Sequence, residues 1–149
     1  MPYEERNAWS ALIAGVITFF IFGTRIWSGT VDGAYVGDAG LSLWAWDVIW
    51  LIGGGIGLTI VVVIAFQILY AILTMTPNPQ FITDERDTMI SRHGSLITLI
   101  VSSGGFMVAV VLLATGWTAL SALNTILGSM ALSGMASEIY RVAVYRFGL

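Results

Sequence analysis

The sequence predicts an all-α integral membrane protein built as a four-transmembrane-helix bundle. Three observations predict this fold: 57% of the 149 residues are hydrophobic, only 10% are charged, and three long stretches carry no charge. An average soluble domain has about 25% charged residues, so this chain lacks the polar side chains that would cover a water-facing surface. The mean hydropathy of +0.87 agrees with this reading. We expect one membrane domain over residues 1–149.

The uncharged stretches predict the spans, because a helix needs about 20 apolar residues to cross a hydrocarbon core about 30 Å thick. The first stretch covers residues 7–24, the second 48–83 and the third 94–137. The third has 44 residues and is too long for one crossing, so we expect Gly116-Trp117 to divide it. The expected spans are residues 8–27, 44–75, 94–115 and 118–137.

Short connections join these spans. We expect a flexible, glycine-rich outer loop over residues 28–43 and an inner loop over residues 76–93 that begins at the Pro77-Asn78-Pro79 breaker. The third and fourth spans are separated only by a tight turn, so they form a helical hairpin. The first span stays as an anchor, because the N-terminal residues do not form the basic region of a signal peptide.

The arginines predict the orientation. Arg25 is the one arginine on the side of the outer loop, and the other five lie near the chain ends or in the inner loop. Under the positive-inside rule this places both termini in the cytoplasm. Aromatic side chains favour the depth of the lipid headgroups, and their positions agree with this orientation. The tryptophans at the outer ends are Trp27, Trp44, Trp46, Trp50 and Trp117, and the tyrosines at the inner ends are Tyr3, Tyr70, Tyr140 and Tyr145.

The composition excludes several classes of chemistry. The chain has no cysteine, no lysine and one histidine. Disulfides, thiolate metal sites, Schiff-base chemistry and multi-histidine metal sites are therefore excluded. A net charge of −3 with six basic residues excludes a nucleic-acid surface. We expect no catalytic residue, no metal and no cofactor.

Small residues are expected to pack the bundle, because helices in lipid associate through close packing and interhelical hydrogen bonds. The fourth span carries a hydroxyl at every fourth position on one face: Ser121, Thr125, Ser129, Ser133 and Ser137. Glycines of the second and third spans are the other candidates: Gly53, Gly57, Gly104 and Gly105. The alternative is that these residues form a homo-oligomer interface or a docking face for a partner.

Charged residues gather at the inner ends of the third and fourth spans. Thr83 or Asp84 is the expected N-cap of the third helix, and acids in its first turn complement the helix dipole. The charged residues form either a salt-bridge collar or a docking site for a ligand or protein partner. The members of this predicted site are Asp84, Arg86, Asp87, Arg92, Glu138, Arg141 and Arg146.

Three patterns carry a resemblance: Asp84-x-Arg86-Asp87-x-x-Ile90-x-Arg92-x-Gly94, the closing Tyr145-Arg146-x-Gly148 and the opening Tyr3-Glu4-Glu5. Together they resemble a family of small bacterial and archaeal four-span membrane proteins that is known as a domain of unknown function. The resemblance is best over residues 84–149, and Asn124 also matches a polar position of the family. It implies four spans in a prokaryotic cytoplasmic membrane. The chain departs from its relatives in having no lysine, and they usually carry several in the inner loop. Some relatives are encoded beside small helix-turn-helix regulators, which implies by analogy a docking role for the charged site.

Other polar side chains have a structural and a functional interpretation. His93 directly precedes the third span, so we expect an interfacial side chain, with axial ligation of a haem or chlorophyll as the alternative. Asp47 is expected to cap a helix or lie at the outer interface, and a proton or cation site is the alternative. Gln67 and Asn124 are amides deep in the spans, which we expect to bond to each other or to backbone carbonyls.

The sequence favours a non-catalytic membrane protein that acts as an accessory subunit of a larger membrane complex or as the membrane partner of a regulator. Its small extramembrane volume and small-residue faces support this class. A small transporter or channel subunit is the alternative, but ionisable residues near mid-membrane, which usually mark ion routes, are absent from the expected spans. A membrane enzyme is disfavoured because acid–base and nucleophilic groups are so few. The expected partners are the lipid bilayer and a protein partner or second copy.

Overall fold

The computed structural model describes residues 3–74 and 84–148, and this part of the chain is all-α. Its elements are α1 (Tyr3–Thr18), η1 (Phe19–Gly23), α2 (Thr24–Val31), α3 (Gly37–Thr74), α4 (Glu85–Ala114) and α5 (Ala119–Phe147). The first three form one continuous rod, so the described residues contain four helices that are long and apolar enough to cross a membrane. The predicted all-α class and the predicted number of four helices able to cross a membrane are confirmed. The chain is a multi-pass membrane protein.

The first rod contains a wide turn at η1. There the backbone N–H of Thr24 donates to the carbonyl of Phe19, five residues back, instead of four as in an α-helix. The π-helical turn therefore accommodates one extra residue. The side chains of Phe19 and Phe20 in this turn are exposed on the apolar rod.

The helices run past the expected spans. α3 has 38 residues, which at a rise of about 1.5 Å per residue makes it about 57 Å long, well beyond the hydrocarbon core. The predicted outer loop over residues 28–43 is therefore wrong, because residues 32–36 alone connect α2 to α3. Gly33 and Gly37 make this short connection with φ angles of 72° and 76°, which residues with a side chain rarely adopt.

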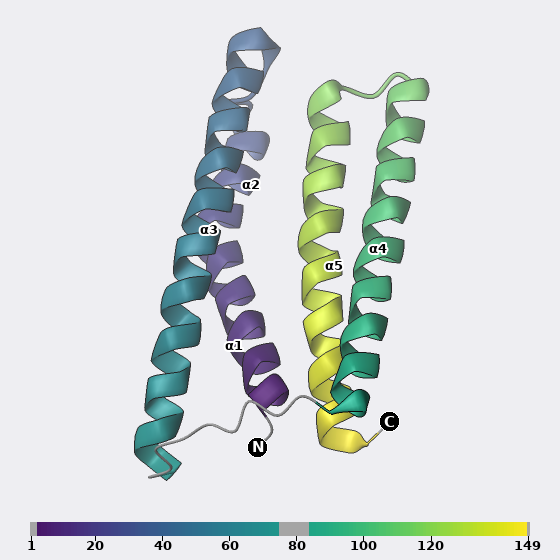
Figure 1. Ribbon diagram of the computed structural model, residues 1–149. Coiled ribbons are helices and arrows are strands. Elements are labelled where there is room, and N and C mark those ends of the chain that lie inside the picture. The colour runs from purple at the N-terminus through teal and green to yellow at the C-terminus, as the bar shows by residue number, and fades with distance from the viewer. Residues whose placement is uncertain (1–2, 75–83, 149) are drawn as a thin grey trace.

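α4 and α5 lie side by side along their length and are joined by residues 115–118, as Figure 1 shows. Gly116 turns the chain there with a φ of 86°. α4 begins inside the predicted inner loop of residues 76–93, so the last part of that loop is helical. The predicted Pro77-Asn78-Pro79 breaker lies outside the described residues.

The rods stand in the order α3, α1, α5, α4 (Figure 1). α1 packs on both α3 and α5, and α4 packs on α5. Both chain ends lie at one end of the molecule, the terminal end, and residues 32–36 and 115–118 lie at the other, the connection end. A small apolar core lies at the connection end. It consists of Ile26, Tyr35 and Trp44, with Val48, Leu51, Leu120, Leu123 and Leu127 packed against them.

Candidate functional site at the terminal end

The acids at the start of α4 are used inside the chain. The Asp84 side chain accepts a hydrogen bond from the backbone N–H of Glu85 at 2.6 Å, and Asp87 accepts one from the Asp84 N–H at 3.1 Å. These bonds belong to a capping box, which satisfies backbone donors that the helix leaves free. Asp84 is therefore confirmed as the N-cap. The other carboxylate oxygen of Asp87 accepts from the Tyr145 hydroxyl of α5 at 2.8 Å.

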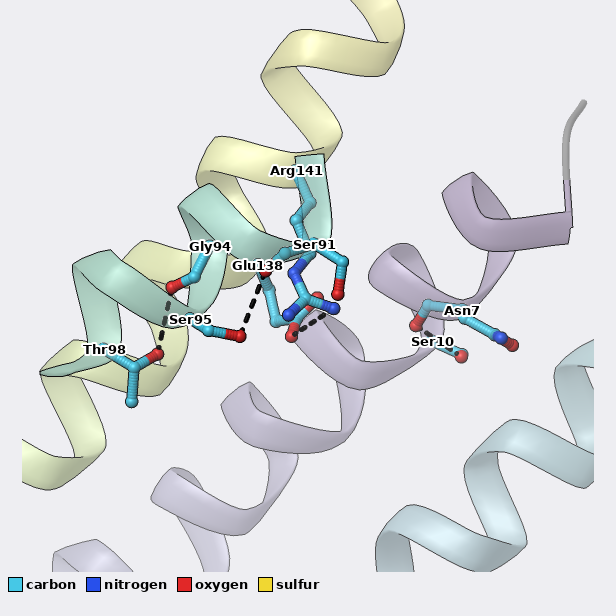
Figure 2. Close-up of polar contacts among 8 residues, drawn as sticks. All are labelled: Asn7, Ser10, Ser91, Gly94, Ser95, Thr98, Glu138 and Arg141. Atoms are coloured by element: carbon cyan, nitrogen blue, oxygen red, sulfur yellow. Dashed lines mark hydrogen bonds and ion pairs between the residues drawn. The ribbon is translucent and has the colours of Figure 1, made fainter. Parts of the chain in front are cut away.

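Arg141 of α5 crosses α4 at a glycine. A Cβ atom at Gly94 would lie 2.6 Å from Nε of Arg141 and 2.9 Å from Oγ of Ser137, so a larger residue would displace both side chains. Figure 2 shows Arg141 beside Glu138, and 3.9 Å separates Nη1 from Oε1. Nε of Arg141 is buried and has no hydrogen-bond partner among the described residues. Packing against α4 therefore positions this guanidinium group more than hydrogen bonding does.

The two patterns of the C-terminal half meet in this cluster. Asp87 contacts Tyr145, and Gly94 accommodates Arg141. Ile90 is buried between these two contacts along α4. Asp87, Gly94 and Tyr145 therefore have a structural use at the α4–α5 contact, although the two patterns lie far apart in sequence.

Three arginines of the predicted site form no ion pair with the described residues. Arg86 and Arg92 of α4 and Arg146 of α5 are exposed, and none of them forms an ion pair with a residue that the structure describes. Within that part of the chain, the ion pairs of the predicted collar reduce to Arg141 with Glu138, three residues apart on one helix. The docking interpretation of the exposed arginines stays a prediction.

Arg6 is a buried cation at the terminal end of α1. Its side chain is 5% exposed, and its guanidinium carbon lies 4.3 Å from the ring centroid of Tyr70 and 5.6 Å from that of Tyr3. Cation–π attraction therefore compensates part of its desolvation. The next residue, Asn7, accepts a hydrogen bond through Oδ1 from Nε2 of Gln67 at 3.0 Å. Sequence reasoning did not predict these α1–α3 contacts, although the basic and amide residues at this depth indicate a need for partners.

A pocket opens at the terminal end between α1 and α4, with a volume of about 330 Å³. Its lining residues are Glu4 of α1 and Asp87, Thr88, Ser91, Arg92 and Ser95 of α4. Glu4 is half-buried and forms no hydrogen bond or ion pair with a described residue. The pocket thus brings together two carboxylates, one guanidinium group and three hydroxyls from two helices.

A second polar cluster lies at the connection end, around Asp47. Asp47 lies inside α3 and is 7% exposed, so the expected capping role is wrong, and its expected place at the outer interface stays a prediction. One oxygen lies 2.9 Å from Nη2 of Arg25, and the other accepts from the Tyr35 hydroxyl at 2.7 Å. Tyr35 is 2% exposed, and its burial together with the Asp47 carboxylate raises its pKa to about 12. Gly29 and Gly40 lie against Tyr35 where a Cβ atom would overlap it.

Asn124 links three helices in the same region. Its Oδ1 accepts from the indole N–H of Trp44 at 2.8 Å, and its Nδ2 donates to Oγ1 of Thr30 at 3.1 Å. The predicted bond between Asn124 and Gln67 is wrong, because both amides bond to side chains on other helices. Trp44 is buried within the bundle. In the sequence, a single asparagine in the fourth span indicated that a donor on another helix, here the Trp44 indole, would lie buried beside it.

His93 is exposed on α4. Its Nδ1 lies 2.9 Å from the carbonyl oxygen of Met89, and its ring centroid lies 6.4 Å from that of Tyr140. Across residues 3–74 and 84–148, no group of three or more histidine, aspartate and glutamate side chains is placed to hold a metal ion. The structure thus gives His93 only a backbone contact within its own helix and a neighbouring ring.

The hydroxyl stripe of α5 lies inside the molecule. Ser133 and Ser137 are buried, and Ser129 lies against Gly105 so closely that a Cβ on the glycine would overlap it. The hydroxyls of Thr125, Ser129 and Ser133 donate to carbonyls of their own helix. Ser121 instead contacts the cap residue of α5, Thr118, at 2.9 Å. The small residues of the stripe therefore let α5 lie close to α4. The hydroxyls of Thr125, Ser129 and Ser133 bond within α5 and not to another helix.

The glycines differ among themselves. A Cβ at Gly53, Gly57 or Gly104 would meet nothing within 4 Å. On α3 it is instead Gly54 that lies against Phe22 and Gly55 that lies against Thr18, where a Cβ would be 3.1 Å from the Thr18 methyl group. Gly54 and Gly55, which lie between the predicted Gly53 and Gly57, therefore make the contact with the first rod.

Comparisons with protein-family models, curated proteins and solved structures found no match to the chain. The resemblance to small four-span membrane proteins therefore stays a prediction.

Proposed function

We propose that this chain is a non-catalytic protein of a prokaryotic cytoplasmic membrane that binds a partner protein at its terminal end. It acts as an accessory subunit of a larger membrane complex or as the membrane partner of a regulator. In this arrangement both termini face the cytoplasm, and α4 and α5 form a hairpin that crosses the membrane twice. Five of the six arginines then lie on the cytoplasmic side, as the positive-inside rule expects.

The observation that carries the proposal is the pair of exposed arginines beside the Asp87–Tyr145 hydrogen bond. This bond joins residues 58 positions apart, so it brings the neighbouring Arg86 and Arg146 to the same end of the α4–α5 pair. Neither arginine pairs with a described residue. The carboxylates of Asp84 and Asp87 are engaged in capping α4 and in the bond to Tyr145, and the exposed Glu85 forms no ion pair with Arg86. Both guanidinium groups remain free to receive carboxylates of a partner.

Apolar side chains accompany these arginines. Met89, one turn after Arg86, and Phe147, next to Arg146, are both exposed. Arginine, methionine and aromatic residues are the types enriched at protein interfaces. The surface therefore suits a partner segment that carries acidic and apolar residues.

The test compares the full-length protein with its Arg86→Gln/Arg146→Gln variant. Each is purified in mild detergent from its native membrane after brief cross-linking, and the attached chains are identified by mass spectrometry. We expect one recurrent chain with the wild type and its loss with the variant. Asp38→Asn, an exposed acid at the connection end, is the control that keeps the partner. Equal recovery of the same chain with both arginines replaced, or no attached chain at all, would refute the proposal.

A small transporter is the second candidate, and buried Asp47 is the observation that favours it. An ionisable residue buried in a membrane helix often marks an ion or proton route. Liposomes containing the wild type should then carry a proton flux that Asp47→Asn abolishes. A flux equal to that of empty liposomes would contradict this candidate.

A further inference from the structure

We propose that the pocket between α1 and α4 binds the zwitterionic headgroup of an aminophospholipid, phosphatidylethanolamine. The ammonium group would lie at Glu4 and Asp87, and the phosphate at Arg92. This inference goes beyond the partner-binding function, because it uses neither Arg86 nor Arg146. It stands on the charges, hydroxyls and position of the pocket.

Among the described residues, no cation forms an ion pair with the two acids of the pocket. Glu4 is half-buried and has no hydrogen bond or ion pair with a described residue. Asp87 accepts one bond from the Tyr145 hydroxyl and one from the Asp84 N–H, and both donors are neutral. A carboxylate offers about four acceptor positions, so Asp87 can accept further bonds. Two partly desolvated carboxylates without a cation favour a ligand that carries an ammonium group.

The other side of the pocket is suited to a phosphate. Arg92 lines the same pocket, yet none of its nitrogens lies within the 4.0 Å that defines an ion pair with a described carboxylate. The guanidinium fork matches phosphate oxygens well. Ser91 adds a hydroxyl that forms no hydrogen bond with the described residues, whereas the Ser95 hydroxyl donates to the Ser91 carbonyl (Figure 2). Separated opposite charges in one pocket fit a zwitterion better than a simple anion or cation.

The position of the pocket points to a lipid rather than a soluble zwitterion. Its lining residues belong to the first turns of α1 and α4, at the terminal end, where the proposed orientation places lipid headgroups. Helical spacing continues the pocket face of α4 from Arg92 and Ser95 to Leu99 and Phe106, whose side chains are 60% and 54% exposed. This apolar stripe can receive an acyl chain. A volume of about 330 Å³ is at the small end of ligand pockets, which suits a headgroup and not a whole lipid.

The experiment measures lipid retention by native mass spectrometry of the full-length protein in detergent. Phosphatidylethanolamine is compared with phosphatidylglycerol and phosphatidylcholine of identical acyl chains. We expect phosphatidylethanolamine to be retained best, because phosphatidylglycerol lacks the ammonium group and phosphatidylcholine carries one that cannot donate hydrogen bonds. Glu4→Gln and Arg92→Gln should each lower this retention on the order of tenfold, the loss of about one charge-assisted hydrogen bond.

Two neighbours provide matched controls. Glu5→Gln changes the next acid of α1, and Arg86→Gln changes another exposed arginine of α4, and neither residue lines the pocket. Both should retain lipid like the wild type, and circular dichroism checks that every variant is folded. Equal retention of the three lipids, or unchanged retention in Glu4→Gln, would overturn the proposal. Displacement of the lipid by soluble phosphoethanolamine at equal concentration would also overturn it, because the site would then recognise a soluble ligand. Partner recovery from Glu4→Gln should stay normal, which separates this test from that of the proposed function.

Discussion

Replacing Gly105 with alanine should destabilise the protein, whereas the same change at Gly104 should not. A Cβ atom at Gly105 would overlap Cβ and Oγ of Ser129 and lie 3.5 Å from its Cα. At Gly104 a Cβ would meet nothing within 4 Å. The two glycines are neighbours on one helix at nearly the same depth. Their variants therefore differ mainly in what the added methyl group meets.

The magnitude follows from two opposing terms. Alanine in place of glycine in a helix interior stabilises by roughly 0.5–1 kcal/mol. An added methyl group in a packed contact typically costs about 1–3 kcal/mol, because the neighbouring backbones have to shift. We therefore expect Gly105→Ala to lower the free energy of unfolding by about 1 kcal/mol and Gly104→Ala to raise it by about 0.5–1 kcal/mol. The two variants should differ by roughly 2 kcal/mol.

The assay is unfolding in mixed micelles by titration with sodium dodecyl sulfate, followed by circular dichroism. Ser129→Gly removes the atoms that the new methyl group would overlap, so adding it to Gly105→Ala should recover most of the interaction cost. If Gly104→Ala and Gly105→Ala unfold at the same detergent fraction, α4 does not meet α5 at this face. A failure of Ser129→Gly to rescue would lead to the same conclusion.

Three further predictions concern single contacts. Asp47→Asn should lower the pKa of Tyr35 from about 12, with burial keeping it above about 10, as measured by the absorbance of tyrosinate. Because the pKa is higher in the folded chain, Tyr35 stabilises the fold below pH about 10, and this contribution is lost as the pH rises towards 12. Tyr145→Phe should lower the free energy of unfolding by about 1 kcal/mol, since Asp87 loses a hydrogen bond. Asn124→Leu should cost about 1–3 kcal/mol, since a buried indole N–H loses its acceptor. Detergent titration measures both losses.

Each of these predictions has a matched control. Asp38→Asn removes an exposed acid at the connection end and should leave the Tyr35 titration unchanged. Tyr140→Phe removes a hydroxyl without a hydrogen bond to the described residues, and Thr125→Val removes one that bonds within its own helix. Both should cost less than the corresponding test variant. A Tyr35 pKa that does not move in Asp47→Asn, or equal losses in test and control, would show that the contact in question does not form.

The number of helices could be predicted from sequence because charge in lipid is costly wherever it falls. The three uncharged stretches, the third of them divided at Gly116-Trp117, therefore give the four rods. The ends of the helices were harder to predict from sequence, because a helix can continue into water without a change in its backbone hydrogen bonds. The residues between Gly37 and Leu43 show this: their glycines suggested a loop, but they form the first turns of α3. Gly40 is there because the backbone of Tyr35 leaves no room for a Cβ.

The partners of side chains depend on how each helix is rotated, which spacing alone does not determine. Asn124 and Gln67 were both recognised as amides that need partners, but each bonds to a residue on another helix instead. The glycine pattern of α3 predicted the region of close packing, but Gly54 and Gly55 make the contact with the first rod and the candidates Gly53 and Gly57 do not. At the terminal end, Asp84 was predictable as a cap because capping is local. The pairing of Asp87 with Tyr145 was not, because it joins distant parts of the chain.

The wide turn at η1 keeps the two halves of the first rod in phase. Because an α-helix turns by about 100° per residue, an extra residue in an unbroken α-helix would rotate everything after Gly23 by that angle relative to Arg6 and Ser10, and the wide turn absorbs this rotation. Thr30 reaches Asn124 in this compensated frame. Deleting one of the exposed residues of η1 would remove the wide turn and leave Thr30 facing Asn124, whereas inserting a second extra residue there would turn Thr30 away from Asn124 by about 100°. The length of this membrane segment is thus constrained by angle as well as by bilayer thickness.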